Sequence, residues 1–494
     1  MDTESVRERV GQAYHQGLDA VIVLVGALVA QLETVAARVA ALESENVALR
    51  ARLGTDSHNS SKPPSSDGPG SKPHPKSQRV VSGRRPGGQP GHPGHTLRLV
   101  DDPDAVEVHT PACCRACGQG LAAVPAIRRE RRQLVDIPPV QALVIEHQVE
   151  TKQCPGCGAE TSGVFPAGLA APVQYGPRVA TVGVYLNQEQ LLPLERTCAV
   201  LEEVFGCPLS EGTLERAVGE CHAQLAQTEG AIKRGVHAAE VAHFDETGVK
   251  ITNKTSWLHV ASTSALTWYG AHPKRGHEAM DALGVLPQFR GRAMHDGLAS
   301  YWRYEQCAHA LCNAHHLREL TFIEEQLGQP WAKDMKALLC EIKRTVADAQ
   351  VQELTALSAA DQAAYSARYD TILKEGFQAN PRPVPTGKRG RPKLGKAGSL
   401  LERLREHKEE TLAFMEDFAV PFDNNQAERD IRMTKVREKI SGCFRTTTGA
   451  EHFCRIRGYI STLRKQGMPI LASLGQAIIG NPPLPATAWP RGPG

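Results

Sequence analysis

Aliphatic residues follow a heptad repeat near the beginning of the chain. Its eleven positions, ten of them aliphatic, are Leu18, Val21, Val25, Leu28, Leu32, Val35, Val39, Leu42, Asn46, Leu49 and Leu53. A buried asparagine at an a position, such as Asn46, favours two parallel helices in register. A helix that packs on its own chain gives a similar pattern, but a repeat of about five heptads favours a coiled coil. We therefore predict a coiled-coil dimerisation helix over residues 1–53, and a homodimer or higher oligomer.

The repeat ends at Gly54, where a stretch rich in glycine, proline and serine begins. These three residue types supply 24 of the 42 residues in 54–95. Such a composition buries too little apolar surface to fold, so residues 54–98 are predicted to be a disordered linker. Between Arg52 and Arg98 there are eight basic and two acidic residues. This charge suits contacts to DNA phosphates, although a merely solubilising linker has the same composition.

Two Cys-x-x-Cys pairs form the next feature. The four residues are Cys114, Cys117, Cys154 and Cys157. Each pair is followed by a glycine, which permits the positive φ of a tight turn, and four thiolates complete a tetrahedral structural Zn²⁺ site. We predict a zinc-binding module over residues 99–170, with a β-rich segment at 133–149 between the pairs. Cys113 is an alternative ligand, and free thiols are the alternative to a metal site.

Apolar residues return at helical spacing in residues 194–205. Gly206 ends this segment, and Ser210 is placed to cap a second helix. Two helices joined by a turn are the elements of a DNA-reading helix-turn-helix motif. Residues 171–235 are therefore predicted to form a helix-turn-helix-like DNA-binding region, although a simple helical hairpin fits the pattern equally well.

Short β segments replace the helical spacing after Gly235. The expected strands are residues 241–245, 256–261, 265–270, 292–296 and the start of 309–320, which continues as a helix; residues 277–283 form a further helix. Two of these strands end on an acid, Asp245 and Asp296. Neighbouring strand ends can bring carboxylates onto one cation. Taken alone, an aspartate at such a position is more commonly a turn former or a helix cap.

A third acid lies on a later predicted helix, residues 423–435. Helical spacing puts Glu428, Arg432 and Lys435 along one face. Three carboxylates suffice for two Mg²⁺ ions, which stabilise both the attacking and the leaving oxygen in phosphoryl transfer. Mn²⁺ can take the same ligands. The alternative interpretation of this helix is a surface set of ion pairs.

Length and composition indicate a globular chain of several domains. Its 494 residues are 41% apolar and 22% charged, and roughly two to four structural units are expected. The longest apolar run, Ala20–Ala30, has eleven residues, fewer than the roughly 20 of a membrane-spanning helix. No signal-peptide pattern flanks it, so we expect a cytoplasmic protein without a membrane partner. Thirteen scattered cysteines argue against a disulfide framework.

The formal net charge of +3 conceals three basic segments. Residues 52–98, 381–396 and 428–465 each carry a net charge of +6. The middle segment contains Lys388, Arg389 and Arg391 beside a glycine and a proline, which resembles a hook for an A·T-rich minor groove. These segments predict DNA binding that weakens strongly as salt is added.

Short motifs follow one another from the heptad repeat to about residue 480. They are Asn59–Asp67, Gly87–His92, the two cysteine pairs, Pro193–Arg196, Asp245–Thr247, Asp296–Gly297, Cys312–His315 and Asn424–Arg429. In this order they resemble a DDE transposase of the bacterial insertion sequence 66 family. The resemblance implies an RNase H-like catalytic domain in residues 236–320 and 419–480, interrupted by a mainly helical insertion over 321–418 and followed by a tail over 481–494. The whole is then a multidomain α+β protein.

The same resemblance implies a metal-binding triad of Asp245, Asp296 and Glu428. Lys435 stands seven residues after Glu428, a spacing at which the lysine of related transposases touches DNA near the cleavage site. Arg429 and Arg432 are expected to contact DNA as well. Cys312 and His315 match a Cys-x-x-His pair of the family, for which a buried thiol and a supporting histidine are the simplest interpretation.

The activity implied is DNA transposition, in which the ends of an insertion sequence are cut and then joined to target DNA. The implied partners are the terminal inverted repeats, target DNA and small accessory proteins of the same element, with Mg²⁺ and structural Zn²⁺ as cofactors. Two alternatives stay open: an RNase H-like nuclease that joins nothing, and a catalytically silent DNA-binding protein derived from a transposase.

Overall fold

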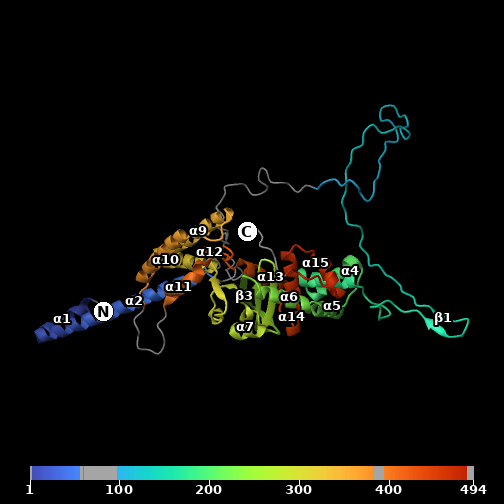
Figure 1. Ribbon diagram of the computed structural model, residues 1–494. Coiled ribbons are helices and arrows are strands. Elements are labelled where there is room, and N and C mark those ends of the chain that lie inside the picture. Colours follow the sequence, from blue (N-terminus) through green and yellow to red (C-terminus); the bar gives the residue numbers. More distant parts are fainter. Residues whose placement is uncertain (1–2, 56–58, 61–96, 383–393, 487–494) are drawn as a thin grey trace. The chain divides into compact units, whose positions relative to one another are not determined.

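The computed structural model describes residues 3–55, 59–60, 97–382 and 394–486. Contacts divide the chain into two compact units, which we describe separately (Figure 1). One unit comprises residues 1–74, 169–199 and 209–494, and the other comprises residues 75–168 and 200–208. Most of the linker expected at 54–98 lies outside the described residues, as do Lys388, Arg389 and Arg391 of the expected minor-groove hook.

Two helices, α1 (Thr3–Gln16) and α2 (Leu18–Leu53), begin the first unit. They meet at Gly17, whose φ of 103° favours glycine. Helix α2 covers the whole heptad repeat, so the helix predicted there is confirmed. Its seam is open to solvent, since Leu32 and Leu42 are 68% and 51% exposed.

The same helix has the length and composition of a membrane span. The stretch Leu18–Val39 meets that test, and none of it is buried within the chain. This stretch is longer than the uninterrupted apolar run Ala20–Ala30 because its mean hydropathy stays high although it includes a few polar residues. A helix that pairs with a partner helix in a coiled coil has the same exposed apolar surface when it is viewed alone.

A five-stranded sheet forms the centre of the first unit. Its strands are β3 (Val241–Ile251), β4 (Lys254–Ser262), β5 (Thr267–His272), β6 (Arg292–His295) and β7 (Ala308–Leu311). They lie in the order β5-β4-β3-β6-β7, with β5, β4 and β3 antiparallel and β3, β6 and β7 parallel. All five expected strands are present. The expectation that the first strand ends at Asp245 is wrong, because β3 continues to Ile251 in register with β4.

Helices cover both faces of this sheet. They are α6 (Ala226–His237) and α7 (His277–Leu283) on one face, and α13 (Asn425–Ser441) and α14 (Thr447–Lys465) on the other. Ala242 and Phe244 of β3 pack toward the first pair, whereas Val249 and Ile251 pack toward the second. Side chains alternate along a strand, so Asp245 faces α13, which lies beside β3 in Figure 1 although it is distant in sequence.

A group of helices follows β7. They are α8 (Asn313–Leu327), α9 (Pro330–Val351), α10 (Ala359–Ala379), α11 (Gly395–Glu406) and α12 (Lys408–Glu416). Their facing sides share a core that includes Trp331, Met335, Leu401 and Phe414. The described residues between 321 and 418 are therefore mainly helical, as expected.

A second group of helices packs near the C-terminal end of the chain. It comprises α3 (Pro177–Val184), the π-helical turn η2 (Tyr185–Glu189), α5 (Glu211–Gln224) and α15 (Ile470–Ile478). Helix α4 (Leu194–Phe205) precedes α5 along the chain, and its residues from Val200 onward belong to the other unit. Both helices of the expected helix-turn-helix form, and the Ser210 side chain caps α5 by accepting the Thr213 N–H. The exposed side chains of α5 include three acids, Glu211, Glu215 and Glu220, and one base, Arg216. Their net negative charge does not favour phosphate, and a role of this region in reading DNA stays a prediction.

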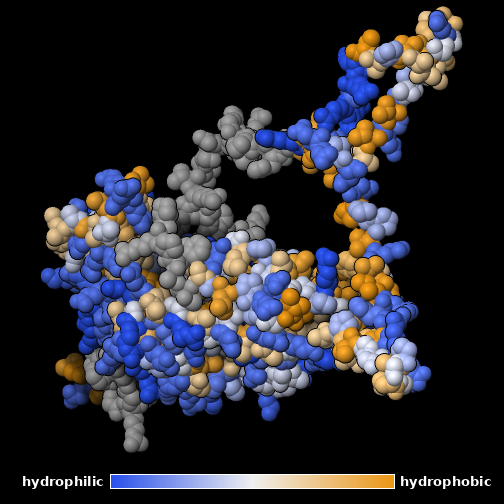
Figure 2. All heavy atoms as spheres, turned by 45° about the vertical axis from the view of Figure 1, so that its right-hand side comes forward, coloured by the Kyte–Doolittle hydropathy of each residue, from blue (hydrophilic) through white to orange (hydrophobic). Residues whose placement is uncertain are grey.

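The second unit has little regular structure. Two short antiparallel strands, β1 (Thr151–Gln153) and β2 (Glu160–Ser162), flank the second cysteine pair. The β-rich segment expected at 133–149 is wrong: these residues form no strand, because no described segment pairs with them. Their apolar side chains are open to solvent, with Ile137 80% and Leu143 83% exposed. Figure 2 shows such apolar residues in orange along this extended part of the chain.

Candidate active site

Asp245 and Asp296 lie side by side because of the register of two parallel strands. Residues Val241 and His243 of β3 are opposite Arg292 and Met294 of β6. The same offset places Asp245 opposite Asp296, the first residue after β6. The two carboxylates meet as expected, but only one of them follows a strand end.

Asn424 positions the helix that carries Glu428. Its side-chain Nδ2 donates to the carbonyl oxygen of Phe244 over 2.8 Å, and its Oδ1 lies 2.8 Å from Nδ1 of His243. Asn424 directly precedes α13, and Glu428 lies in the first turn of that helix. These bonds therefore hold the first turn of α13 against β3, beside the strand position of Asp245.

Electrostatic interactions connect the three predicted carboxylates. Burial raises the pKa of Asp245 well above its ordinary value, and the charges of Glu246, Asp296 and Glu428 raise it further. A divalent cation relieves this kind of concentrated negative charge. Because the donors are all carboxylate oxygens, the group matches the preference of Mg²⁺ or Mn²⁺. The residues present thus fit the metals that the sequence implies.

Glu246 adds a fourth acid on the opposite face of β3. It accepts hydrogen bonds from the Tyr301 hydroxyl over 2.7 Å and from Nε of Arg275 over 2.9 Å. Nη2 of Arg275 also lies 3.9 Å from Oδ2 of Asp296. Burial, followed by the charge of Asp296, raises the pKa of Glu246. Arg275 thus connects two acids of the site.

Glu246, Arg275 and Tyr301 were not predicted from the sequence as part of the site. The only signal for Glu246 was its position next to Asp245 in the Asp-Glu-Thr motif. Arg275 lies between β5 and α7, Tyr301 begins a short 3-10 helix (Tyr301–Arg303), and neither belongs to a local sequence pattern.

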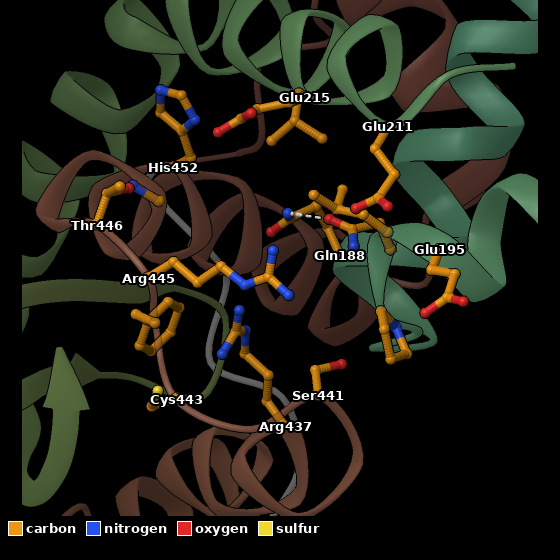
Figure 3. A pocket seen from close by; sticks show the side chains of 16 residues that line it. Gln188, Glu195, Glu211, Glu215, Arg437, Ser441, Cys443, Arg445, Thr446 and His452 are labelled. Carbon is orange, nitrogen blue, oxygen red and sulfur yellow. Dashed lines mark hydrogen bonds between the residues drawn. The ribbon is translucent and has the colours of Figure 1, made fainter. Parts of the chain in front are cut away.

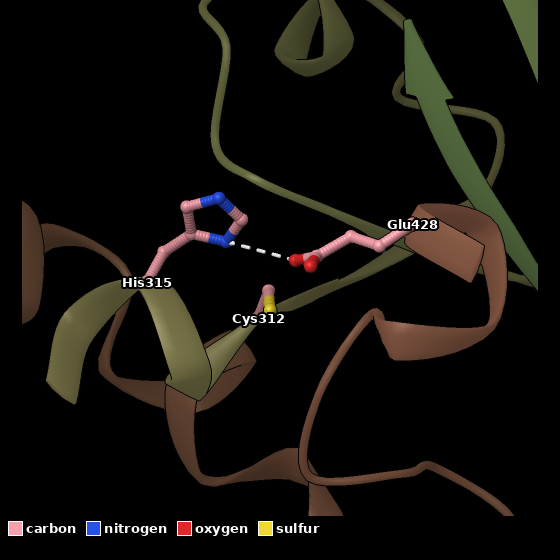
Figure 4. A group of neighbouring side chains, drawn as sticks. All are labelled: Cys312, His315 and Glu428. Carbon is pink, nitrogen blue, oxygen red and sulfur yellow. Dashed lines mark ion pairs between the residues drawn. The ribbon is translucent and has the colours of Figure 1, made fainter. Parts of the chain in front are cut away.

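Helix α8 approaches Glu428 from the other side. Nδ1 of His315 lies 3.8 Å from Oε1 of Glu428, and Nη2 of Arg318 lies 3.6 Å from its Oε2. Cys312, just before α8, lies close to both His315 and Glu428 (Figure 4). Burial raises the pKa of Cys312 to about 12 and lowers the pKa of His315. The Cys-x-x-His pair is therefore part of the surroundings of Glu428.

The predicted DNA-contacting cations of α13 are exposed. Arg429 and Arg432 lie at the surface, and Arg429 donates to Gln426 over 3.0 Å. Lys435 shares the face of Glu428, but its Nζ donates to the carbonyl oxygen of Gly248 and lies 2.9 Å from Glu438. A DNA phosphate would have to compete with these two acceptors for Lys435.

Each predicted cysteine pair forms the expected turn. The N–H of Gly118 donates to the Cys114 carbonyl over 2.9 Å, and the N–H of Gly158 donates to the Cys154 carbonyl over 2.8 Å. Both glycines have positive φ, 76° and 74°. Backbone N–H groups within each turn lower the pKa of Cys114 and of Cys154, which favours the thiolate form.

The structure does not bring the two pairs together. Within the described residues, one group of three or more metal-ligating side chains has ligand atoms within 4.8 Å of one another. It consists of Cys312, His315 and Glu428 and contains no cysteine of either pair. Cys117 and Cys157 are exposed like most of this unit. A small unit with little buried apolar surface commonly depends on metal binding to close its fold.

A cavity of about 200 Å³ lies between the second group of helices and the C-terminal end of α13 (Figure 3). Its charged and titratable lining residues are Glu195, Glu211, Glu215, Arg437, Cys443, Arg445 and His452. The guanidinium of Arg437 lies 3.7 Å from the ring centre of Phe444, and burial lowers its pKa to about 10. None of the three predicted catalytic acids lines this cavity, so it is separate from the carboxylate site.

Comparison with protein families gives three matches. Residues 172–452 match the family described as Transposase IS66 family, and residues 111–158 match the zinc-finger binding domain of transposase IS66. Residues 12–98 match a family of unknown function, DUF6444. A search of curated proteins found no match. The first match covers more than half of the chain and includes every carboxylate of the site, and the chain therefore belongs to the IS66 family of DDE transposases.

Proposed function

We propose that Asp245, Asp296 and Glu428 form the catalytic site with which this transposase cuts the ends of its element and joins them to target DNA. The observation that carries the proposal is the placement of these acids on adjoining elements: strand register brings Asp245 beside Asp296, and Asn424 holds the first turn of α13 against the same strand. The order and directions of the five strands support an RNase H-like domain.

The chemistry needs two successive attacks at phosphorus. Water first attacks the phosphodiester at the element end and releases a 3′ hydroxyl, which then attacks a phosphodiester of the target and displaces a new 3′ oxygen. Two divalent cations held by the three carboxylates would stabilise the attacking and leaving oxygens. No protein nucleophile is required, so no covalent intermediate with the chain forms.

The residues around the acids would organise this site. Arg275 lies between Glu246 and Asp296 and supports both carboxylates. Arg318 and His315 approach the two oxygens of Glu428 from α8. Arg429 and Arg432 are exposed on α13 beside Glu428, and Lys435 follows on the same helix, where the three cations would hold the DNA strand.

We also propose roles for the cysteine pairs, for helix α2 and for the basic segments. Cys114, Cys117, Cys154 and Cys157 would bind one structural Zn²⁺. The exposed seam of α2 would form the coiled coil of a homodimer or higher oligomer. The basic segments would contact the phosphates of element and target DNA, and the protein would act in the bacterial cytoplasm, on the nucleoid, with small accessory proteins of the element.

Cleavage and joining of DNA that carries the element ends test this proposal. Asp245→Asn, Asp296→Asn and Glu428→Gln should each lower both steps at least about a hundred-fold while end binding persists. Exposed Asp348→Asn is the control. An RNase H-like nuclease would cut but never join, and a silent DNA-binding protein would do neither.

A further inference from the structure

Cys312, His315 and Glu428 form a cluster whose donor atoms differ from those of the carboxylate site. Cys312 directly precedes α8, His315 lies in the first turn of α8, and Glu428 lies in the first turn of α13. One nitrogen, one sulfur and one oxygen of these side chains all lie within 4.8 Å of one another. Figure 4 shows His315 and Glu428 pointing toward each other, with the Cys312 thiol beside them.

Two atoms of this cluster have unused hydrogen-bonding capacity. Among the described residues, Nδ1 of His315 and Oε1 of Glu428 are buried and have no hydrogen-bond partner. Buried polar atoms are almost always paired, and an unpaired one costs about 1–3 kcal/mol. The two atoms are 3.8 Å apart, too far for a mutual hydrogen bond. Two ligands that each lie about 2 Å from one ion are themselves about 3–4 Å apart.

The donor set selects the kind of ion. Mg²⁺ prefers oxygen ligands, whereas a set of imidazole nitrogen, thiolate sulfur and carboxylate oxygen suits Zn²⁺ and similar borderline-soft cations. When such an ion binds, the Cys312 thiol gives its proton to solvent. The N–H of Asn424 already donates to the Cys312 sulfur over 3.1 Å, and that bond would stabilise the thiolate.

We propose that Cys312, His315 and Glu428 bind Zn²⁺ or a similar cation at a second metal site that shares Glu428 with the catalytic site. The proposal rests on the proposed function, which gives Glu428 its catalytic role. Occupation of the second site withdraws Oε1 of Glu428 from the catalytic ions. Zinc therefore inhibits DNA cleavage, and the ratio of free Zn²⁺ to Mg²⁺ regulates transposition.

Cobalt titration of the full-length chain tests the binding. Co²⁺ replaces Zn²⁺ in such sites, and a cysteine ligand gives a sulfur-to-cobalt charge-transfer band. The band of the wild type should contain a component that Cys312→Ser lacks. In His315→Asn, the same component should require at least a ten-fold higher concentration of Co²⁺. Cys340→Ser, which changes a half-buried thiol of α9, is the matched control and should keep the component. Equal titrations of the wild type, Cys312→Ser and His315→Asn would overturn the proposal.

Folding of each variant is verified by circular dichroism. If Cys312→Ser does not fold, His315→Asn decides the test, because His315 is partly exposed and its replacement keeps a polar side chain. A His315→Asn titration identical to that of the wild type then overturns the proposal.

Zinc inhibition provides the second readout. In cleavage assays with Mg²⁺, added Zn²⁺ should inhibit the wild type and Cys340→Ser equally, and inhibition of His315→Asn, scored against its own activity, should need at least ten-fold more Zn²⁺. Asp245→Asn separates the two proposals, since it should lose cleavage and keep the cobalt component. If Asp245→Asn loses cleavage but the wild type lacks the component, the second site is wrong and the catalytic triad stands. If the component is present but Asp245→Asn still cleaves, the triad is wrong.

Discussion

Asn424 donates its side-chain amide to the backbone carbonyl of Phe244 over 2.8 Å, and this bond joins the helix of Glu428 to the strand of Asp245. The two acids are separated by most of the catalytic region in sequence, including the whole helical insertion. Asn424 is 1% exposed, so water cannot replace the bond. This side chain therefore helps to fix the relative position of the two acids.

Asn424→Ala should weaken both the fold and the site. The change leaves the Phe244 carbonyl and the His243 ring without their partner, which costs about 1–3 kcal/mol in the free energy of unfolding. DNA cleavage should fall more than the fraction of unfolded protein explains. Urea unfolding and cleavage assays measure both. Asn425→Ala, at the exposed next position, should change neither, and equal effects of the two variants would contradict the assigned role.

Asp245→Asn should make the metal-free protein more stable while it abolishes cleavage. The folded pKa of Asp245 lies well above its ordinary value of 3.8. The folded state therefore holds its proton more strongly, and the stability of the metal-free wild type falls as pH rises from that ordinary value through the raised pKa. At pH 7, Asp245→Asn should melt about 2–4 °C higher than the wild type in a chelator, and lose most of the stabilisation by Mg²⁺. Melting curves with and without Mg²⁺ measure this, and an unchanged response to Mg²⁺ would count against the metal site.

His259 should make the fold sensitive to acid. Burial lowers its pKa from 6.5 to about 4. Between these values the unfolded chain takes up a proton that the folded chain does not, so stability falls as pH falls through this window, by up to about 1.4 kcal/mol per pH unit. His259→Gln should reduce that slope in urea unfolding at pH 7 and pH 5. The exposed His277→Gln should keep it, and an equal slope in all three proteins would refute the prediction.

Zinc content should depend on both cysteine pairs. We expect Cys117→Ser and Cys157→Ser each to remove the zinc bound by residues 99–170 because a tetrahedral site needs all four thiolates. Elemental analysis of purified protein measures the stoichiometry. Cys443→Ser, which changes an exposed thiol outside the pairs, should leave it unchanged. Cys117→Ser and Cys157→Ser should therefore each bind one zinc fewer than the wild type, and an unchanged stoichiometry in either variant would contradict a shared site.

The seam of α2 should hold the oligomer together. Leu32→Asp places a charge at an a position and should dissociate the dimer, whereas Ala37→Asp places the same charge on the opposite side of the helix and should not. Light scattering after size-exclusion chromatography measures the molar mass. Equal masses for both variants and the wild type would place the interface elsewhere.

Periodicity predicted the elements better than the site. The five strands and the long N-terminal helix follow from alternation and heptads, and glycines mark the turns at both cysteine pairs. The extension of β3 to Ile251 was missed because it depends on pairing with β4, which no local pattern reveals. The β-rich segment expected at 133–149 is absent for the same reason, since apolar alternation does not supply a neighbouring strand.

Contacts between distant segments also limited how much of the site could be predicted. The prediction of Asp245, Asp296 and Glu428 as the triad came from the motifs that carry the family resemblance. Arg275 and Tyr301 meet Glu246 only through the tertiary fold, and the contact of His315 with Glu428 requires α8 and α13 to be adjacent. A single sequence does not reveal contacts between residues that are so far apart along the chain.

The most direct test of the central claim is a joining assay with DNA that ends in a preformed 3′ hydroxyl at the element terminus. In Mg²⁺, the wild type should join this end to a target plasmid, and Glu428→Gln should bind the same end without joining it. Joining by Glu428→Gln at the wild-type rate, or wild-type protein that cuts element ends and never joins them, would contradict a single three-carboxylate site for both steps.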